Sequence, residues 1–187
     1  MNITYEEKII LLSAARKSIE SIFTKTKIET PDYEQHPILK LNAGAFVTIT
    51  ELNSLRGCIG YILSDQPLFE TICDAAVQAA MHDPRFPPLS KNEISQIKIE
   101  ISVLSPPFIL HSYDEIIIGK HGLILEENSA RGLLLPQVPV EHNMNRDQYL
   151  DAICQKSGLS KKYWQTQQIK LKGFTAEVFS EDILMGE

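Results

Sequence analysis

The sequence Leu-Arg-Gly-Cys-Ile-Gly at residues 55–60 is the stretch best equipped for chemistry. It places the thiol of Cys58 between two glycines, Gly57 and Gly60, with Arg56 close by. Because glycine adopts backbone conformations closed to other residues, the hexapeptide is predicted to form a tight turn. The permanent charge of Arg56 would favour the thiolate, which is the nucleophilic form of cysteine. The stretch therefore predicts a candidate site centred on Cys58.

Cys58 has three possible roles. Free cysteine is among the most buried residue types, so Cys58 could simply be a small residue that shapes the turn. It could instead be a thiolate nucleophile or a soft metal ligand. Cys73 and Cys154 lie on predicted helices near apolar positions and are expected in the core. Three separated cysteines without a C-x-x-C pair predict neither a disulfide framework nor a zinc site.

A proline-rich stretch at residues 83–89 is predicted to form a rigid loop that acts as a binding wall opposite the thiol. Asp83 and Arg85 on this loop allow two interpretations. They form a mutual salt bridge that locks the loop, or the guanidinium of Arg85 recognises an anion with Arg56 as a second prong. Phe86 is expected to anchor the loop to the core rather than to stack on a ligand.

Two regular elements must position this site. Residues 44–50 are rich in β-branched and aromatic side chains and predict a strand that leads into the hexapeptide. Pro67 suits the first turn of a helix through residue 81, whose small apolar residues permit close approach to a sheet. Because this helix begins soon after Gly60, its N-terminal dipole is expected to point toward the thiol. Residues 61–63 are expected to return as a short strand.

The rest of the chain mixes helices and strands without a regular β-α-β rhythm. Capping boxes and apolar periodicity predict the helices, and alternating hydrophobicity predicts the strands. The expected helices are residues 5–23, 90–93, 145–154 and a short one holding Tyr163 and Trp164; the expected strands are residues 97–103, 123–125, 132–135 and 169–179. Residues 123–135 are expected to form a hairpin. This pattern favours an α+β fold with a mostly antiparallel sheet.

Composition places the chain among ordinary globular proteins. Its 187 residues carry a net charge of −6 without a basic run, which argues against an extended nucleic-acid surface. The apolar runs are too short for a membrane span, and the acidic N-terminal residues do not open a signal peptide. A cytoplasmic location with reduced thiols is therefore expected.

Five motifs occur in a fixed order and point to a known family. They are Gly-Ala-Phe-Val-Thr at residues 44–48, the hexapeptide at 55–60, Asp-x-Arg-Phe-Pro-Pro-Leu at 83–89, His-Gly at 121–122, and Leu-Leu-Pro-x-Val at 134–138. With them the sequence resembles the AMMECR family, whose prokaryotic members are called AmmeMemoRadiSam system protein A. The resemblance covers nearly the whole chain.

The resemblance implies a single AMMECR-type domain over residues 1–187, with or without a smaller subdomain. It implies an α+β fold of two unequal subdomains, with the hexapeptide lining a cleft between them. The system name implies a Memo-like protein and a radical SAM enzyme as partners. It attaches neither a reaction nor a cofactor to the family.

The resemblance also ranks the histidines. His121 and His142 match motif positions, so they are the better candidates for a base beside Cys58, with His121 preferred. A turn histidine that hydrogen-bonds the backbone is the alternative role for each. One departure lies nearby, because Asn143, Met144 and Asn145 stand where many prokaryotic members have glycine, tryptophan and aspartate.

Three functional hypotheses follow. The first is a cysteine-centred small-ligand or modification activity, with Cys58 and His121 as catalytic residues. In it, the binding residues are Arg56, Gly57, Gly60, Asp83, Arg85, Phe86 and His142. The second is a non-catalytic adaptor or carrier that docks a partner protein through the same cleft. The third is a purely architectural hexapeptide. Residue types leave open whether the protein is an enzyme, which cofactor it uses and how it assembles.

Overall fold

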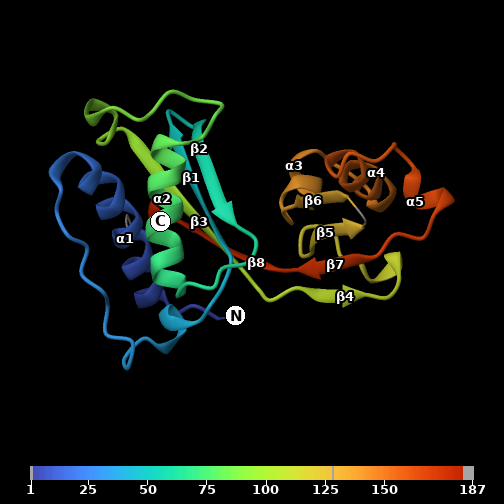
Figure 1. Cartoon of the computed structure of the whole chain (residues 1–187), viewed down its shortest axis with the longest axis horizontal. Coiled ribbons are helices and arrows are strands. Elements are labelled where there is room, and N and C mark those ends of the chain that lie inside the picture. The colour runs from blue at the N-terminus through green and yellow to red at the C-terminus, as the bar shows by residue number, and fades with distance from the viewer. Residues whose placement is uncertain (1, 128, 183–187) are drawn as a thin grey trace. The chain divides into compact units, whose positions relative to one another are not determined.

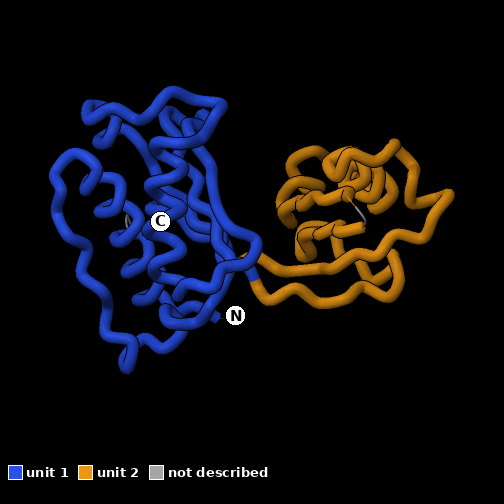
Figure 2. Tube along the Cα trace, viewed as in Figure 1, with its two compact units in different colours: residues 1–104, 177–187 blue, residues 105–176 orange. Residues whose placement is uncertain are grey.

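The computed structural model describes residues 2–127 and 129–182 and divides the chain into two units. Unit 1 comprises residues 1–104 and 177–187, and unit 2 comprises residues 105–176 (Figure 2). Each unit contains helices and a four-stranded antiparallel sheet, which confirms the predicted α+β class (Figure 1). None of the described helices has the length and apolar composition to cross a bilayer.

Unit 1 combines two long helices with the sheet that carries Cys58. The helices are α1 (Tyr5–Thr24) and α2 (Leu68–Met81), with short 3-10 helices at Pro37–Lys40 and Lys91–Glu93. The sheet order is β2-β1-β3-β8, formed by β1 (Ala45–Glu51), β2 (Ser54–Tyr61), β3 (Ile97–Leu104) and β8 (Ala176–Ser180). The predicted capping box of α1 is confirmed, since Thr4 and Glu7 each bond the other's backbone N–H. In the sheet order, β2 has a neighbouring strand on one side only, so it is an edge strand.

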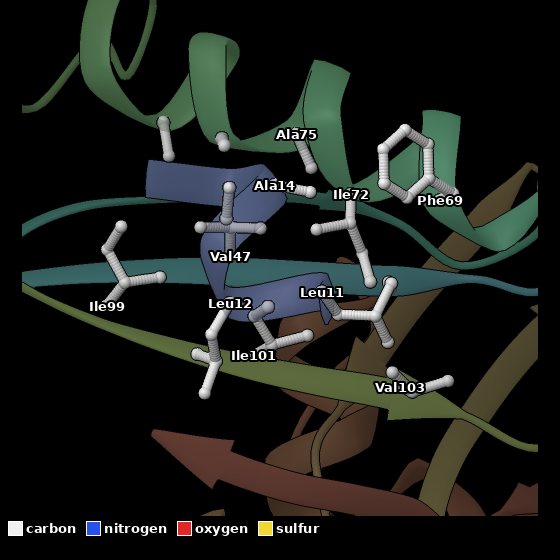
Figure 3. Packing of buried hydrophobic residues seen from close by; sticks show 14 of the residues in the cluster. Leu11, Leu12, Ala14, Val47, Phe69, Ile72, Ala75, Ile99, Ile101 and Val103 are labelled. Carbon is white, nitrogen blue, oxygen red and sulfur yellow. The ribbon is translucent and has the colours of Figure 1, made fainter. Parts of the chain in front are cut away.

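The core of unit 1 lies between the sheet and both helices (Figure 3). Along β1 the side chains of Ala45, Val47 and Ile49 are buried and alternate with less buried ones, because successive side chains point to opposite faces. The small residues of α2 that face them, Ala75 among them, are also buried and permit close contact. This confirms the predicted small-residue stripe.

The hexapeptide is part of strand β2, so the predicted turn and the strand at residues 61–63 are both wrong. The tight turn comes earlier, at Leu52 and Asn53, which both have positive φ and join β1 to β2. Positive φ at both central residues matches the twist of a two-residue hairpin. Neither Gly57 nor Gly60 has a positive φ among the described residues. The presence of glycine at these two positions therefore has another cause.

Close packing explains both glycines. A Cβ at Gly57 would lie 2.3 Å from the carbonyl oxygen of Ala79 on α2. A Cβ at Gly60 would lie 2.3 Å from the carbonyl oxygen of Ala45 on β1. Only glycine therefore allows this close an approach of β2 to α2 at residue 57 and to β1 at residue 60.

Unit 2 builds its own core on a second sheet. The sheet order is β4-β7-β5-β6, formed by β4 (Phe108–Leu110), β5 (Gly122–Glu127), β6 (Ala130–Leu134) and β7 (Leu171–Phe174). The helices are α3 (Val138–Glu141), α4 (Arg146–Lys156) and α5 (Tyr163–Thr166), with a 3-10 helix at Tyr113–Glu115. Tyr149, Leu150 and Ile153 of α4 are buried against this sheet. The predicted hairpin of β5 and β6 is confirmed, although residue 128 of its turn lies outside the described residues.

The predicted single strand at residues 169–179 is wrong, because it is two strands in different sheets. Strand β7 ends at Phe174 and β8 begins at Ala176. Between them the backbone of Thr175 bonds Ser105, accepting from its N–H at 2.8 Å and donating to its hydroxyl at 2.9 Å. The chain passes from one sheet to the other at a single residue. The alternation of apolar residues therefore continues from β7 into β8, and the sequence shows no break between the two strands.

We predict that Gly57→Ala destabilises unit 1 by about 1–3 kcal/mol, because the added methyl group collides with backbone and α2 must move away from β2. Urea unfolding of both proteins measures the difference. Ser54→Ala, at an exposed position of the same strand, is the control and should leave the midpoint unchanged. Equal midpoints for Gly57→Ala and the wild-type protein would contradict the packing explanation.

Candidate functional site

Cys58 lies on the face of the unit 1 sheet opposite α1 and α2. Its cross-strand partner is Thr48, which alternates along β1 with the helix-facing Val47 and Ile49. Residues paired across strands share a face. The Thr48 hydroxyl donates to the Cys58 sulfur at 3.3 Å, and the thiol is partly exposed. The thiol therefore has a polar neighbour and access from outside the unit 1 core.

The backbone of Cys58 is held by the Asp83–Arg85 ion pair. The Cys58 N–H donates to Asp83 Oδ2 at 2.8 Å, and Arg85 Nη2 donates to the Cys58 carbonyl at 3.3 Å. The guanidinium is itself bonded to the carboxylate, with Nε at 2.9 Å from Oδ1 and Nη2 at 2.7 Å from Oδ2. An edge strand leaves such backbone groups without a strand partner. The ion pair completes the edge at the residue that carries the thiol.

Asp83 is a buried carboxylate that remains ionised. Its side chain is only 2% exposed, whereas that of Arg85 is 54% exposed. Hydrogen bonds from Arg85, with further ones from the N–H groups of Cys58 and Arg85, hold the pKa of Asp83 well below its usual range despite burial. The same pairing raises the pKa of Arg85. Asp83 is consequently a fixed negative charge beneath β2.

The guanidinium of Arg56 is bonded to groups of residues 87–93. Its Nε donates to Glu93 Oε1 at 2.7 Å and its Nη1 donates to the Pro87 carbonyl at 3.0 Å. The hydrogen bond from Arg56 is the main reason that the pKa of Glu93 falls to about 2. Only 12% of the Arg56 side chain is exposed. Arg56 thus ties β2 to residues 87–93 and is not available as a second anion-binding prong.

The N-terminal dipole of α2 is also not beside the thiol, so that prediction is wrong. The part of α2 that packs on Gly57 is Ala79, in the last turn of the helix. The C-terminal end of a helix carries partial negative charge and does not favour a thiolate.

The loop at residues 83–89 meets β2 as predicted, through Asp83 and Arg85. Its buried anchor is Leu89, whose N–H donates to the Ala80 carbonyl at 2.8 Å. Phe86 is partly buried, and the Arg85 guanidinium lies 5.6 Å from its ring centroid. The side chain of Phe86 therefore supports the exposed arginine.

The two candidate histidines belong to unit 2. His121 is nearly buried, packs edge-to-face on Phe108 at 5.2 Å, and its Nδ1 accepts weakly from the Ile117 N–H at 3.4 Å. Burial is the main cause that lowers the pKa of His121, so the ring is neutral near pH 7. His142 is exposed and ends helix α3. The His121 ring thus bonds the backbone, and a pairing of either histidine with Cys58 stays a prediction.

The other two cysteines pack in or against the hydrophobic cores. Cys154 is fully buried in unit 2, and Cys73 packs against the unit 1 core. Burial raises the pKa of both thiols. Within residues 2–127 and 129–182, no three histidine, cysteine or acidic side chains come close enough to hold a metal ion.

Two residues of the site were missed in the sequence. Thr48 occupies an outward position in the alternation of the predicted strand, which was enough to place it beside Cys58 once the hairpin register was known. Glu93 was recognised only as part of a capping box, and it does cap Ser90. Its second role, as partner of Arg56, depends on contacts distant in sequence.

Comparisons with known proteins agree with this architecture. The model of the AMMECR1 family matches residues 12–179. A protein of Thermococcus onnurineus is 39% identical, with 94% of this chain and 91% of that protein aligned. A protein of Methanosarcina barkeri is 38% identical, with 92% and 89% aligned.

A crystal structure also matches, that of the uncharacterised protein PH0010 from Pyrococcus horikoshii. Its TM-score is 0.81 at 38% identity, and the match covers 91% of this chain and 89% of that one. The fold and the edge-strand thiol define a small α+β protein with two antiparallel sheets. The chain belongs to the AMMECR1 family.

We predict that Asp83→Asn costs about 1–3 kcal/mol of stability at pH 7, because a charged hydrogen-bond acceptor is lost. The native pKa of Asp83 lies below its unfolded value, so its contribution is present above a pH of about 4 and is lost as pH falls. Stability of the variant should therefore decline less steeply between about pH 4 and pH 2. Urea midpoints across pH measure both effects.

The control is Asp65→Asn, in an exposed loop of the same unit. Its stability should decline with falling pH as steeply as that of the wild-type protein. An equally steep decline of stability below about pH 4 for Asp83→Asn and the wild-type protein would show that Asp83 is not the stabilising charge described above.

Proposed function

We propose that the protein acts through Cys58, whose thiol serves as the nucleophile in a small-ligand or modification activity. The thiol proton passes to a base, for which His121 is the candidate residue, and this leaves the thiolate as the nucleophilic form of Cys58. Arg85 offers an exposed cation for an anionic ligand beside the thiol. The sequence placed Arg56 among the ligand-binding residues. In this proposal Arg56 instead holds residues 87–93 against β2 and does not bind the ligand.

One observation carries this proposal: both backbone polar groups of Cys58 are held by side chains of a loop distant in sequence. A cysteine that only fills space requires no such positioning. The sulfur itself is left partly exposed, with the Thr48 hydroxyl directed at it. The arrangement supports a positioned, accessible thiol.

Thiol labelling tests the proposal. With iodoacetamide near pH 7.5, Cys58 should react at least about tenfold faster than Cys73 or Cys154, because Cys73 packs against the unit 1 core, Cys154 is buried, and desolvation raises the pKa of both thiols. Peptide mass spectrometry over time gives the three rates separately. The comparison requires native protein, since unfolding exposes all three thiols.

Cys58→Ser is the matched control and should remove the fast phase while leaving the two slow ones. Labelling of Cys58 at or below the rate of Cys73 would reject the nucleophile and leave the architectural role of the hexapeptide. The Gly57 contact with α2 already shows that part of the hexapeptide is architectural.

A docking role without catalysis is the second candidate, and exposed apolar residues favour it. Leu52 at the hairpin turn is 86% exposed, and Leu55 on β2 is 42% exposed. The proposed partners are a Memo-like protein and a radical SAM enzyme. If Cys58→Ser keeps the affinity for a Memo-like protein and Leu55→Asp loses it, docking is favoured. Arg85→Ala is unsuitable here, because it would leave Asp83 buried without its cation.

A further inference from the structure

A groove of about 830 Å³ lies on unit 2, and all residues that line it belong to that unit. It contains part of the sheet face opposite α4. On that face the register aligns Ile109, Lys172 and Ile124 in one row across β4, β7 and β5. Glu126, two residues after Ile124, and Lys170, two residues before Lys172, line the same groove. Its volume is in the range of small-ligand pockets.

Two aromatic rings stand at this groove in fixed positions. Tyr113 and Trp164 meet edge-to-face, with ring centroids 5.7 Å apart. The Trp164 indole N–H donates to Asp151 at 2.8 Å, and the Tyr113 hydroxyl accepts from the Ile169 N–H at 3.0 Å. Both polar ends are therefore used inside unit 2. The two rings pack against the unit 2 core, and their remaining surface lines the groove.

The groove carries positive charge although the chain has a net charge of −6. Lys172 is paired with Glu126 at 3.1 Å, so these two charges largely cancel. Lys170 is exposed, and no ion pair is found for it among the described residues. An anion entering the groove would thus meet an uncompensated ammonium group next to aromatic and aliphatic surface.

We propose that this groove binds a small anionic molecule with a planar aromatic ring. The ring packs against the Trp164 and Tyr113 side of the groove and the aliphatic Ile109, while the anionic group pairs with Lys170. The exposed amides of Gln165, Gln167 and Gln168 supply hydrogen bonds at the rim. The groove is lined by none of the residues assigned to the Cys58 site, so the proposal can be tested independently of the thiol chemistry.

Fluorescence tests this proposal, because Trp164 is the single tryptophan of the chain. The probe is 8-anilinonaphthalene-1-sulfonate, an aromatic anion that accepts energy from tryptophan. Titration of the native protein should quench Trp164 and produce sensitised probe emission that saturates. N-phenyl-1-naphthylamine, which has the same rings without the sulfonate, should bind at least about fivefold more weakly.

Two charge reversals decide whether binding depends on the groove. Lys170→Glu should lower the affinity for the sulfonate probe by about fivefold or more. Lys161 is an exposed lysine outside the groove, so Lys161→Glu should leave that affinity unchanged. Circular dichroism confirms that both variants remain folded. Absence of sensitised emission, equal affinity for the uncharged probe, or equal effects of the two reversals would each overturn the proposal.

Discussion

The hydrogen bond from the Cys58 amide to the Asp83 carboxylate is the interaction on which the site depends. A buried carboxylate is tolerated only when donors surround it, and Asp83 finds them in Arg85 and in two backbone N–H groups. One of those groups belongs to an edge strand and the other to the loop after α2. The requirement to satisfy one charge therefore fixes the strand, the loop and the end of the helix together.

A second tie acts in the same direction. Arg56 links β2 to Glu93 and to the Pro87 carbonyl, so the loop is attached to the strand on both sides of Gly57. Both arginines that seemed suited to a ligand thus serve the loop first, and only Arg85 retains an exposed side chain. The close Gly57–Ala79 contact completes this arrangement from the helix side. What remains for chemistry is the thiol, the Thr48 hydroxyl and one exposed guanidinium.

Local signals in the sequence predicted much of this structure. The capping boxes at Thr4, Ser90 and Asn145 and the alternation of residues 97–103 gave correct elements, because caps and alternation act over a few residues. The glycines were misinterpreted, since a tight turn and a close approach to a neighbouring helix require the same residue. The salt bridge of Asp83 with Arg85, two residues away, was one of the two interpretations of that loop. Glu93 lies 37 residues from Arg56 and Cys58 lies 25 residues from Asp83, and nothing local indicates these two pairs.

Native-state hydrogen exchange of the Cys58 amide tests the central claim directly. If Asp83 holds this edge-strand N–H, its exchange should be at least about tenfold slower in the wild-type protein than in Asp83→Ala, while Asp65→Ala matches the wild-type rate. An amide at Cys58 that exchanges equally fast in the wild-type protein and in Asp83→Ala would contradict the account.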